Sequence, residues 1–325
     1  MKAKLVALSM AAVALAIAGC SNDENLTDND PNAPVEIRLT GGLEVQTRAP
    51  HGLDMLLKAG EQVHVWVDDA GVANKELYKD RELTAVDNGA LTGETMYFPQ
   101  TGNAVNIYAI HGNFGEDTDW TGSGFWGEEI MHKVEQNQKT GQETDGYAKS
   151  DLVYVQSTNV ARTKEDINLQ FKHLLSKVEV VLVKGTGSPD IEKVEILNTK
   201  LEAAFFPDKE SEFWVVENGD TKPIEIDTHL TEKTAAENKD NDAGKVLNEA
   251  IIVPQTLVAG TQFIRVTTAD GGELIYRLPK GKTFEPAKKY RFTVTANLTE
   301  LKVVSAKITD WTSEIVDDNG VAEMD

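Results

Sequence analysis

The sequence contains a single cysteine, Cys20, among 325 residues. A lone thiol has no partner for an internal disulfide, so Cys20 is either free or modified. Basic residues are also scarce, with 32 Lys and Arg against 53 Asp and Glu. The resulting formal charge of −21 repels phosphate backbones and anionic lipid headgroups, which argues against nucleic-acid binding and against electrostatic docking on a membrane.

Motifs of catalysis are missing as well. The sequence has no HExxH, no GxSxG, no P-loop and no GxGxxG, and carboxylates are so abundant that pairs of them indicate no glycosidase site. None of the histidines has a neighbour at zinc-ligand spacing, and His173 is expected to be a hydrogen-bonded structural residue. We therefore expect no enzyme and no cofactor. The histidines are His51, His64, His111, His132, His173 and His229.

Helical patterns are few, whereas strand patterns are many. Only residues 129–138 and 230–239 are weakly helical. Gly, Asn and Asp turns such as Asn88-Gly89 separate short β-rich runs, a pattern typical of antiparallel sandwiches and of an all-β fold. The expected strands are 35–39, 63–67, 105–110, 152–155, 167–171, 178–183, 194–197, 213–216, 251–253, 263–267, 274–278, 290–296 and 303–308.

The N-terminal segment has the pattern of an export signal. Lys2 and Lys4 precede an apolar run that is too short to span a bilayer, so residues 1–19 are predicted to be a cleaved signal peptide. Ile17-Ala18-Gly19-Cys20 resembles a bacterial lipobox, which makes Cys20 the expected lipid attachment site. Residues 20–33 are polar and acidic and are predicted to form a flexible tether. Acidic residues directly after the cysteine resemble a surface-export signal of bacteria with two membranes, or they are simply a soluble spacer.

The remaining chain is long enough for two domains. About 290 residues follow the tether, which is large for one core. The polar run at 159–166 separates two groups of expected strands, and no internal repeat suggests a solenoid or propeller. We therefore expect an N-terminal β-sandwich at 34–160 and a C-terminal β-sandwich at 161–325.

One acidic loop matches part of a calcium-binding pattern. Asp117, Asp119, Thr121 and Glu128 follow the spacing of an EF-hand loop, but Gly124 stands where an apolar residue is expected and no helices flank it. An acidic surface loop is the favoured interpretation, so no metal is expected. The same loop carries several aromatic residues, which we expect to pack onto the sandwich rather than to bind glycans. These residues are Phe114, Trp120, Phe125 and Trp126.

Several short motifs occur in an order that resembles the fimbrillin family, the pilin-like lipoproteins of bacterial type V pili. A leader with a lipobox is followed by a TRA tripeptide, an SDL-Y element, an FKH–LSKV unit between two strands and a closing strand ending in DW. In this chain the motifs are Thr47-Arg48-Ala49, Ser150-Asp151-Leu152 with Tyr154, Phe171-Lys172-His173, Leu175-Ser176-Lys177-Val178 and Asp310-Trp311.

The resemblance implies two tandem transthyretin-like antiparallel β-sandwiches, and a fimbrial subunit assembled by donor-strand exchange. An arginine-specific protease would cut at Arg48–Ala49 and release an N-terminal strand with its lipid. The released strand would place alternate side chains in the core, with Gly41-Gly42 as a bend, and other pilin subunits would supply its replacement. Alternatively, Arg48 is an ordinary surface residue. The side chains of the removable strand are Val35, Ile37, Leu39, Leu43 and Val45.

The resemblance implies an outer-membrane lipoprotein exposed at the surface, which becomes part of a fimbrium after processing. The acidic tail after Trp311 has a poor alternation for a donor strand, so the donor lies earlier, at about 308–316, or the chain is a minor, tip or anchor subunit rather than a stalk subunit. A permanently lipid-anchored binder of glycan or protein is the alternative function. An extracellular hydrolase fits least, because the catalytic motifs are missing.

Overall fold

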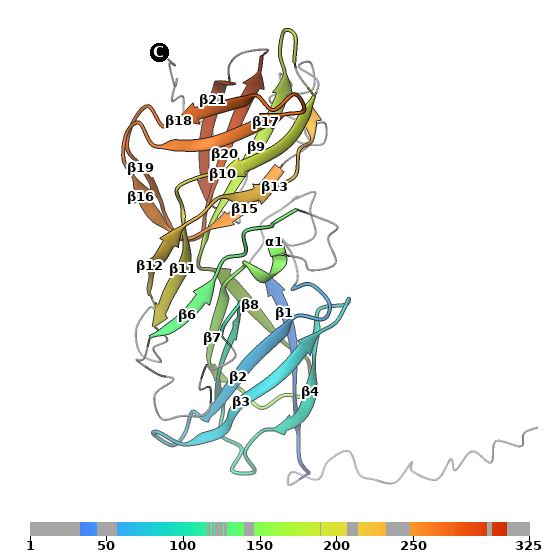
Figure 1. Ribbon diagram of the computed structural model, residues 1–325. Helices are drawn as coiled ribbons and strands as arrows, with labels where there is room; N and C mark the ends of the chain where they lie inside the picture. Colours follow the sequence, from blue (N-terminus) through green and yellow to red (C-terminus); the bar gives the residue numbers. More distant parts are fainter. Residues whose placement is uncertain are drawn as a thin grey trace, which may run out of the picture. The chain divides into compact units, whose positions relative to one another are not determined.

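The computed structural model describes residues 33–43, 57–115, 118, 120, 126, 129–139, 146–188, 190–206, 214–231, 248–297 and 301–310 (Figure 1). The described part is all-β, as the sequence predicted, with only one short helix, α1 (Gly146–Lys149). All of these elements belong to one compact unit, Val35–Asp325. The predicted signal peptide, Cys20 and, apart from Ala33, the predicted tether lie outside the described residues.

Seven strands form a closed sheet around the first hydrophobic core. Only the contact between β1 and β8 is parallel, and every other pair in this sheet is antiparallel. In order around the sheet the strands are β1 (Glu36–Leu43), β4 (Ala90–Tyr97), β3 (Glu76–Ala85), β2 (Gln62–Asp69), β5 (Val105–His111), β7 (Val153–Val160) and β8 (Ile167–His173).

The closed sheet has a period-two pattern wherever one face is buried. In β8, Leu169, Phe171 and His173 are buried while Asn168, Gln170 and Lys172 are exposed. Apolar side chains on the inner face therefore fix the register of each strand, because a slip of one residue would turn that face to solvent.

The remaining strands form four further sheets around a second core. One has the order β13 (Ile224–Ile226), β10 (Ile191–Ile196), β17 (Gln262–Thr268), β18 (Glu273–Arg277). Another has the order β14 (Leu230–Thr231), β9 (Ser176–Lys184), β20 (Lys288–Ala296), β21 (Leu301–Asp310), with β15 (Asn248–Ile252) also paired to β9. The two smaller sheets are β12 (Trp214–Thr221), β11 (Lys200–Phe206), β6 (Ile130–Lys133), and β16 (Gln255–Leu257) with β19 (Lys282–Phe284).

Buried charges sit at the start of β9, within the LSKV motif. Lys177 is 1% exposed, and its Nζ lies 3.1 Å from Glu249 Oε1 and 3.7 Å from Glu179 Oε1. Arg291 on β20 contributes Nε at 2.6 Å from Glu179 Oε2. Burial alone would raise the pKa of Glu179, but the charges of Lys177 and Arg291 outweigh it and hold that pKa below its ordinary value. The motif thus holds β15, β9 and β20 in register through paired charges.

Two expectations about helices need correction. Residues 129–138 are not helical, because Ile130 and His132 are buried at strand spacing and β6 pairs with β11. In the second segment Leu230 and Thr231 form β14, and its remainder lies outside the described residues. Each of the thirteen expected strands overlaps a strand of the structure, whereas β3, β4, β11 and several short strands were not expected.

Residues on either side of the expected domain boundary contact each other closely. β8, which follows residue 160, pairs with β7 and β1 of the closed sheet. β6, which precedes that residue, pairs with β11.

Candidate functional site

β1 is the strand that completes the closed sheet. It pairs in parallel with β8 from Leu39↔Ile167 to Leu43↔Phe171 and antiparallel with β4 at four positions. Ile37 and Leu39 are 4% and 3% exposed and lie in the first core, against which the half-buried Val35 also packs. Alternate side chains of β1 therefore face the interior, as a strand between two neighbours requires.

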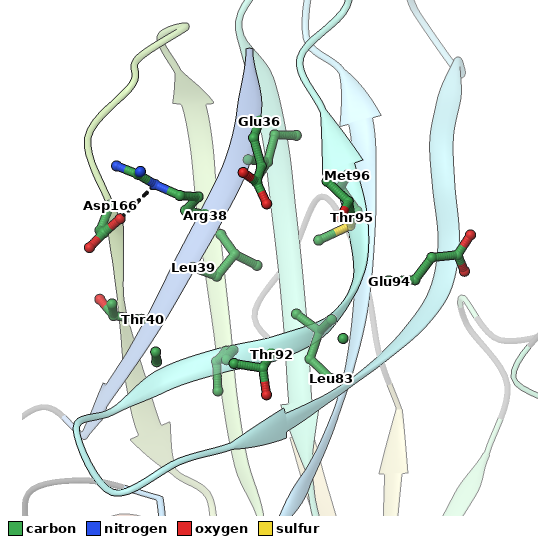
Figure 2. Close-up of a pocket in the computed structure, with 14 residues that line it drawn as sticks. Glu36, Arg38, Leu39, Thr40, Leu83, Thr92, Glu94, Thr95, Met96 and Asp166 are labelled. Atoms are coloured by element: carbon green, nitrogen blue, oxygen red, sulfur yellow. Dashed lines mark ion pairs between the residues drawn. The ribbon is translucent and has the colours of Figure 1, made fainter. Parts of the chain in front are cut away.

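The ladder between β1 and β4 is interrupted. Ile37 lies opposite Met96 and Leu39 opposite Leu91, so residues 92–95 of β4 face only Arg38. A groove of about 290 Å³ opens at this point between the two strands. Figure 2 shows Leu39 and Met96 directed toward the gap, while Arg38 turns away toward Asp166.

β4 also leaves its other neighbour, β3, after Gly93. The two strands pair only at three positions, from Leu83↔Gly93 to Ala85↔Leu91. Beyond them the Tyr78 hydroxyl accepts a hydrogen bond from the Tyr97 N–H at 2.8 Å and donates to the Tyr97 carbonyl at 3.3 Å. The Tyr78 side chain thus supplies hydrogen bonds to Tyr97 where β4 and β3 have no ladder pair.

Arg38 connects β1 to the segment before β8. Its Nε lies 2.8 Å from Asp166 Oδ1, and its guanidinium also donates to the Lys164 carbonyl. The side chains of Arg38 and Asp166 are 50% and 59% exposed. An ion pair in solvent of this kind contributes at most about 1 kcal/mol.

Gly41 and Gly42 do not form the expected bend. Both continue β1, with Gly41 opposite Leu169 and Gly42 opposite Gln170, and the Gly41 N–H donates to the Gly89 carbonyl at 2.7 Å. The chain stays extended because β8 and the β3–β4 turn supply backbone partners on both sides.

The SDL-Y and FKH motifs meet beside this strand. The Nδ1 of His173, at the end of β8, donates to the Asp151 carboxylate, with oxygens at 2.9 and 3.0 Å. Both side chains are buried, so His173 has the structural role that the sequence predicted. Ser150 Oγ accepts the Glu135 N–H and donates to the Gly146 carbonyl. The bond between His173 and Asp151 anchors β8, one of the two neighbours of β1.

His132 lies buried next to this motif. Its Nδ1 accepts the Asn113 N–H at 3.0 Å, and its Nε2 donates to the Ser150 carbonyl at 3.0 Å. Burial lowers the pKa of His132 to about 4. The neutral imidazole is the form that satisfies both bonds.

The described aromatic residues of the acidic loop pack inward, as expected. Phe114, Trp120 and Trp126 lie against the second core, and the Trp120 ring stacks on His64 at a centroid distance of 3.9 Å. Trp126 meets Tyr108 edge-on at 4.9 Å. These three rings thus pack against neighbouring side chains of the protein itself. Phe125 lies outside the described residues.

Other predicted site residues fall where the structure gives no description. Cys20, Val45, Arg48 and Ala49 lie outside the described residues, and for Leu43 only the backbone is described. The calcium candidates Asp117, Asp119, Thr121 and Glu128 also lie outside them. Within the described ranges, no group of three or more His, Cys, Asp or Glu side chains is placed to hold a metal ion. Nor does that part of the chain contain a helix of the length and apolarity needed to cross a membrane.

Sequence reasoning missed the second neighbour of β1. Leu91 and Met96 of β4 form part of the wall against which Ile37 and Leu39 pack, yet the strand sequence ALTGETMY lacks alternation. The four exposed residues 92–95 between two buried ones hide the pattern. A turn signal at Asn88-Gly89 followed by Leu91 was the only available indication.

Comparison with known proteins places the chain in a family. The model of the fimbrillin-like family matches residues 47–311, and no curated protein matches the chain. A proposed cell adhesion protein from Bacteroides uniformis aligns with a TM-score of 0.58 at 19% identity, covering 86% of this chain and 98% of that one. The C-terminally truncated tip fimbrial protein Mfa3 from Porphyromonas gingivalis aligns with a TM-score of 0.51 at 11% identity, covering 86% of this chain and 100% of that one. At these identities the structures support a shared fold only, whereas the family model supports membership of the family. Because that model covers most of the sequence, the chain belongs to the fimbrillin-like family.

Proposed function

We propose that this chain is a structural subunit of a surface fimbria, exported as a lipoprotein through Cys20 and assembled by strand exchange after cleavage at Arg48. The observation that carries the proposal is the place of β1, a single strand between β4 and β8 that completes the closed sheet. Its partners would be other pilin subunits, an arginine-specific protease and, through the lipid, the outer membrane. The role is structural rather than catalytic.

β1 is the one strand of the closed sheet that a single cut can release without interrupting the others. It precedes β2 in the sequence, and the remaining strands of this sheet, β2, β3, β4, β5, β7 and β8, all follow it. Its loss would expose the backbone edges of β4 and β8 and the apolar surface beneath Ile37 and Leu39, which costs several kcal/mol. An extended segment from another subunit would restore both the ladder and the core.

The arginines near β1 differ in their suitability as cleavage sites. Arg38 lies inside β1, flanked by paired residues, with its guanidinium bonded to Asp166 and Lys164. A protease must bind an extended backbone that is free of such pairing. Arg48 is the only arginine between β1 and β2 in the sequence. Cleavage at Arg48 is therefore proposed, and cleavage at Arg38 is not.

The N-terminus of the protein in surface fibres tests this proposal. We expect surface material to begin at Ala49 and to form an SDS-resistant ladder on mild heating. Arg48→Ala should abolish both, while Arg38→Ala, the matched control, should leave the Ala49 start unchanged. Normal fibres from the Arg48→Ala variant, or fibres that retain lipidated Cys20, would contradict the proposal.

Two finer features belong to the same proposal. We take the subunit to consist of two tandem transthyretin-like sandwiches, divided near residue 160. The presence of two cores supports two sandwiches, but each core includes residues from both sides of that point, such as Tyr154 in the second core and Phe171 in the first. The donor strand of this chain is not expected to start at Ile308, because β21 pairs with β20 along its whole length to Asp310. A permanently anchored binder is less well supported, because Trp120 and Trp126 pack against the second core.

A further inference from the structure

We propose that β1 is held only weakly in its slot, the space between β4 and β8 that it fills in the closed sheet. We further propose that this slot fits a replacement strand with a β-branched residue where β1 has Gly42. This inference rests on the proposed function and adds to it how the resident strand is made easy to displace. The occupant that replaces β1 is an extended segment of a second subunit. Three features of β1 support this view.

The first feature is the interrupted ladder. Between Ile37 and Leu39, β1 advances by two residues while β4 advances by five, from Met96 to Leu91. Among the described strands, residues 92–95 make no ladder pair with β1, and all four are exposed. β1 is therefore joined to β4 by two short blocks of pairing that can open one after the other.

The second feature is the glycine pair in the interior of the strand. Glycine weakens a strand because it brings no side chain to the packed face and loses much backbone freedom on folding. At Gly41 a Cβ would lie 3.3 Å from the Phe171 ring and 3.4 Å from Leu91, so this position is tight. Gly41 thus fits its surroundings, but Gly42 has a different environment.

At Gly42 a side chain can be accommodated. A Cβ there would lie 3.2 Å from Gln170 Nε2 and 3.4 Å from Asn168 Oδ1, the ends of two exposed polar side chains that can rotate away. Space therefore does not require glycine at this position. Nor is its φ in the left-handed region, where glycine is favoured. The glycine weakens β1 where a threonine or valine would strengthen it.

The third feature is the exposure of the side-chain link. Arg38 and Asp166 are each at least half exposed, so solvent and salt screen their ion pair. Among the described residues no buried charge pair fixes β1, in contrast to Lys177 and Glu249 in β9 and β15. The side chains that anchor the strand within the described part are thus Ile37 and Leu39, with Val35 partly buried beside them.

Hydrogen exchange of the intact chain, followed by mass spectrometry, tests how weakly β1 is held. We expect the amides of residues 36–43 to exchange at least about tenfold faster than those of 167–173, the neighbouring strand. Gly42→Thr should slow exchange of 36–43 by about fivefold, and Gly42→Ala should have a smaller effect, since alanine lacks the branch. Glu217→Thr, on an exposed position of β12, should leave 36–43 unchanged.

The peptide preference of the slot tests the second half of the proposal. After cleavage at Arg48, labelled peptides of residues 34–46 with Gly42 or with Gly42→Thr are offered as replacement strands. We expect about fivefold greater uptake of the threonine peptide. Equal uptake, or a Gly42→Thr protein that exchanges faster than the wild type, would overturn the inference.

The outcomes separate this inference from the proposed function. Equal protection of 36–43 and 167–173 would overturn the weak retention of β1, yet surface fibres that begin at Ala49 would still support assembly by strand exchange. Failure of both peptides to enter the cleaved protein would instead contradict the proposed function itself.

Discussion

The side chain of Gln138 bonds twice to the backbone of Ile251. Its Nε2 donates to the Ile251 carbonyl at 2.8 Å, and its Oε1 accepts the Ile251 N–H at 2.7 Å. Gln138 is 1% exposed and lies 113 residues away in the sequence. The amide thus acts as a strand partner for β15 on the side away from β9.

Removal of this amide should be costly. Gln138→Leu leaves the buried N–H and C=O of Ile251 without their bonds from this side chain, and each such group costs about 1–3 kcal/mol. We expect the free energy of unfolding to fall by about 2–4 kcal/mol, measured by urea titration. Gln136→Ala, on an exposed neighbour, should change it by less than about 0.5 kcal/mol. Equal effects of the two variants would show that the two hydrogen bonds between Gln138 and Ile251 contribute nothing to stability.

The lowered pKa of His132 predicts a loss of stability in mild acid. An unfolded histidine has a pKa near 6.5, whereas in the fold it is about 4, so between these values the unfolded chain binds the extra proton. Stability is therefore undiminished above pH 6.5 and falls as the pH drops toward 4, by about 2 kcal/mol at pH 5.

The measurement compares unfolding free energies at pH 7 and pH 5 in the wild type and in His132→Gln. Carboxylates titrate in both proteins, so the difference between the two pH slopes isolates the imidazole. We expect the variant to be less stable at pH 7, because it changes a buried hydrogen-bonded side chain, but to have the flatter slope. Identical slopes would contradict the prediction.

The buried and the exposed ion pairs should differ in energy despite similar distances. Lys177→Met leaves Glu249 without its buried partner, and breaking such a pair costs about 3–5 kcal/mol. Arg81 Nη1 lies 2.6 Å from Glu94 Oε2, but the Glu94 side chain is 68% exposed, so Arg81→Gln should cost less than about 1 kcal/mol. Thermal and urea unfolding of both variants measures the contrast, and comparable losses would contradict it.

Much of the fold could be predicted from the sequence where burial gives a local pattern. The alternation of Leu169 and Phe171 with exposed polar residues predicted β8, and the run around Val180 predicted β9. The helix expected at 129–138 was wrong because Ile130, Val134 and Gln138, which are buried, lie four residues apart, and this is also a helical spacing. In the structure Ile130 and Val134 both lie against β11, through the β6–β11 ladder and the hydrogen bond from Val134 to Leu201, whereas Gln138 bonds to Ile251 of β15.

The candidate site was only half predictable. Ile37 and Leu39 alternate with exposed Glu36 and Arg38, so their burial could be expected. The partners of β1 could not, because β4 has four exposed residues in succession and β8 follows β1 by more than 120 residues. Contacts at such separation have no local signal, and the extended course of Gly41-Gly42 depends on them.

The two anchoring side chains of β1 provide the last prediction. Leu39 is 3% exposed in the first core, and truncation of a buried leucine to alanine costs about 2–5 kcal/mol. Because β1 can open separately from the rest of the sheet, we expect Leu39→Ala to accelerate hydrogen exchange of residues 36–43 by tenfold or more. The same variant should leave the exchange of 176–184 in β9 unchanged. Thr40→Ala, next to it and only half-buried, is the matched control and should have little effect. A uniform acceleration of both segments by Leu39→Ala would mean that β1 opens only with the whole molecule.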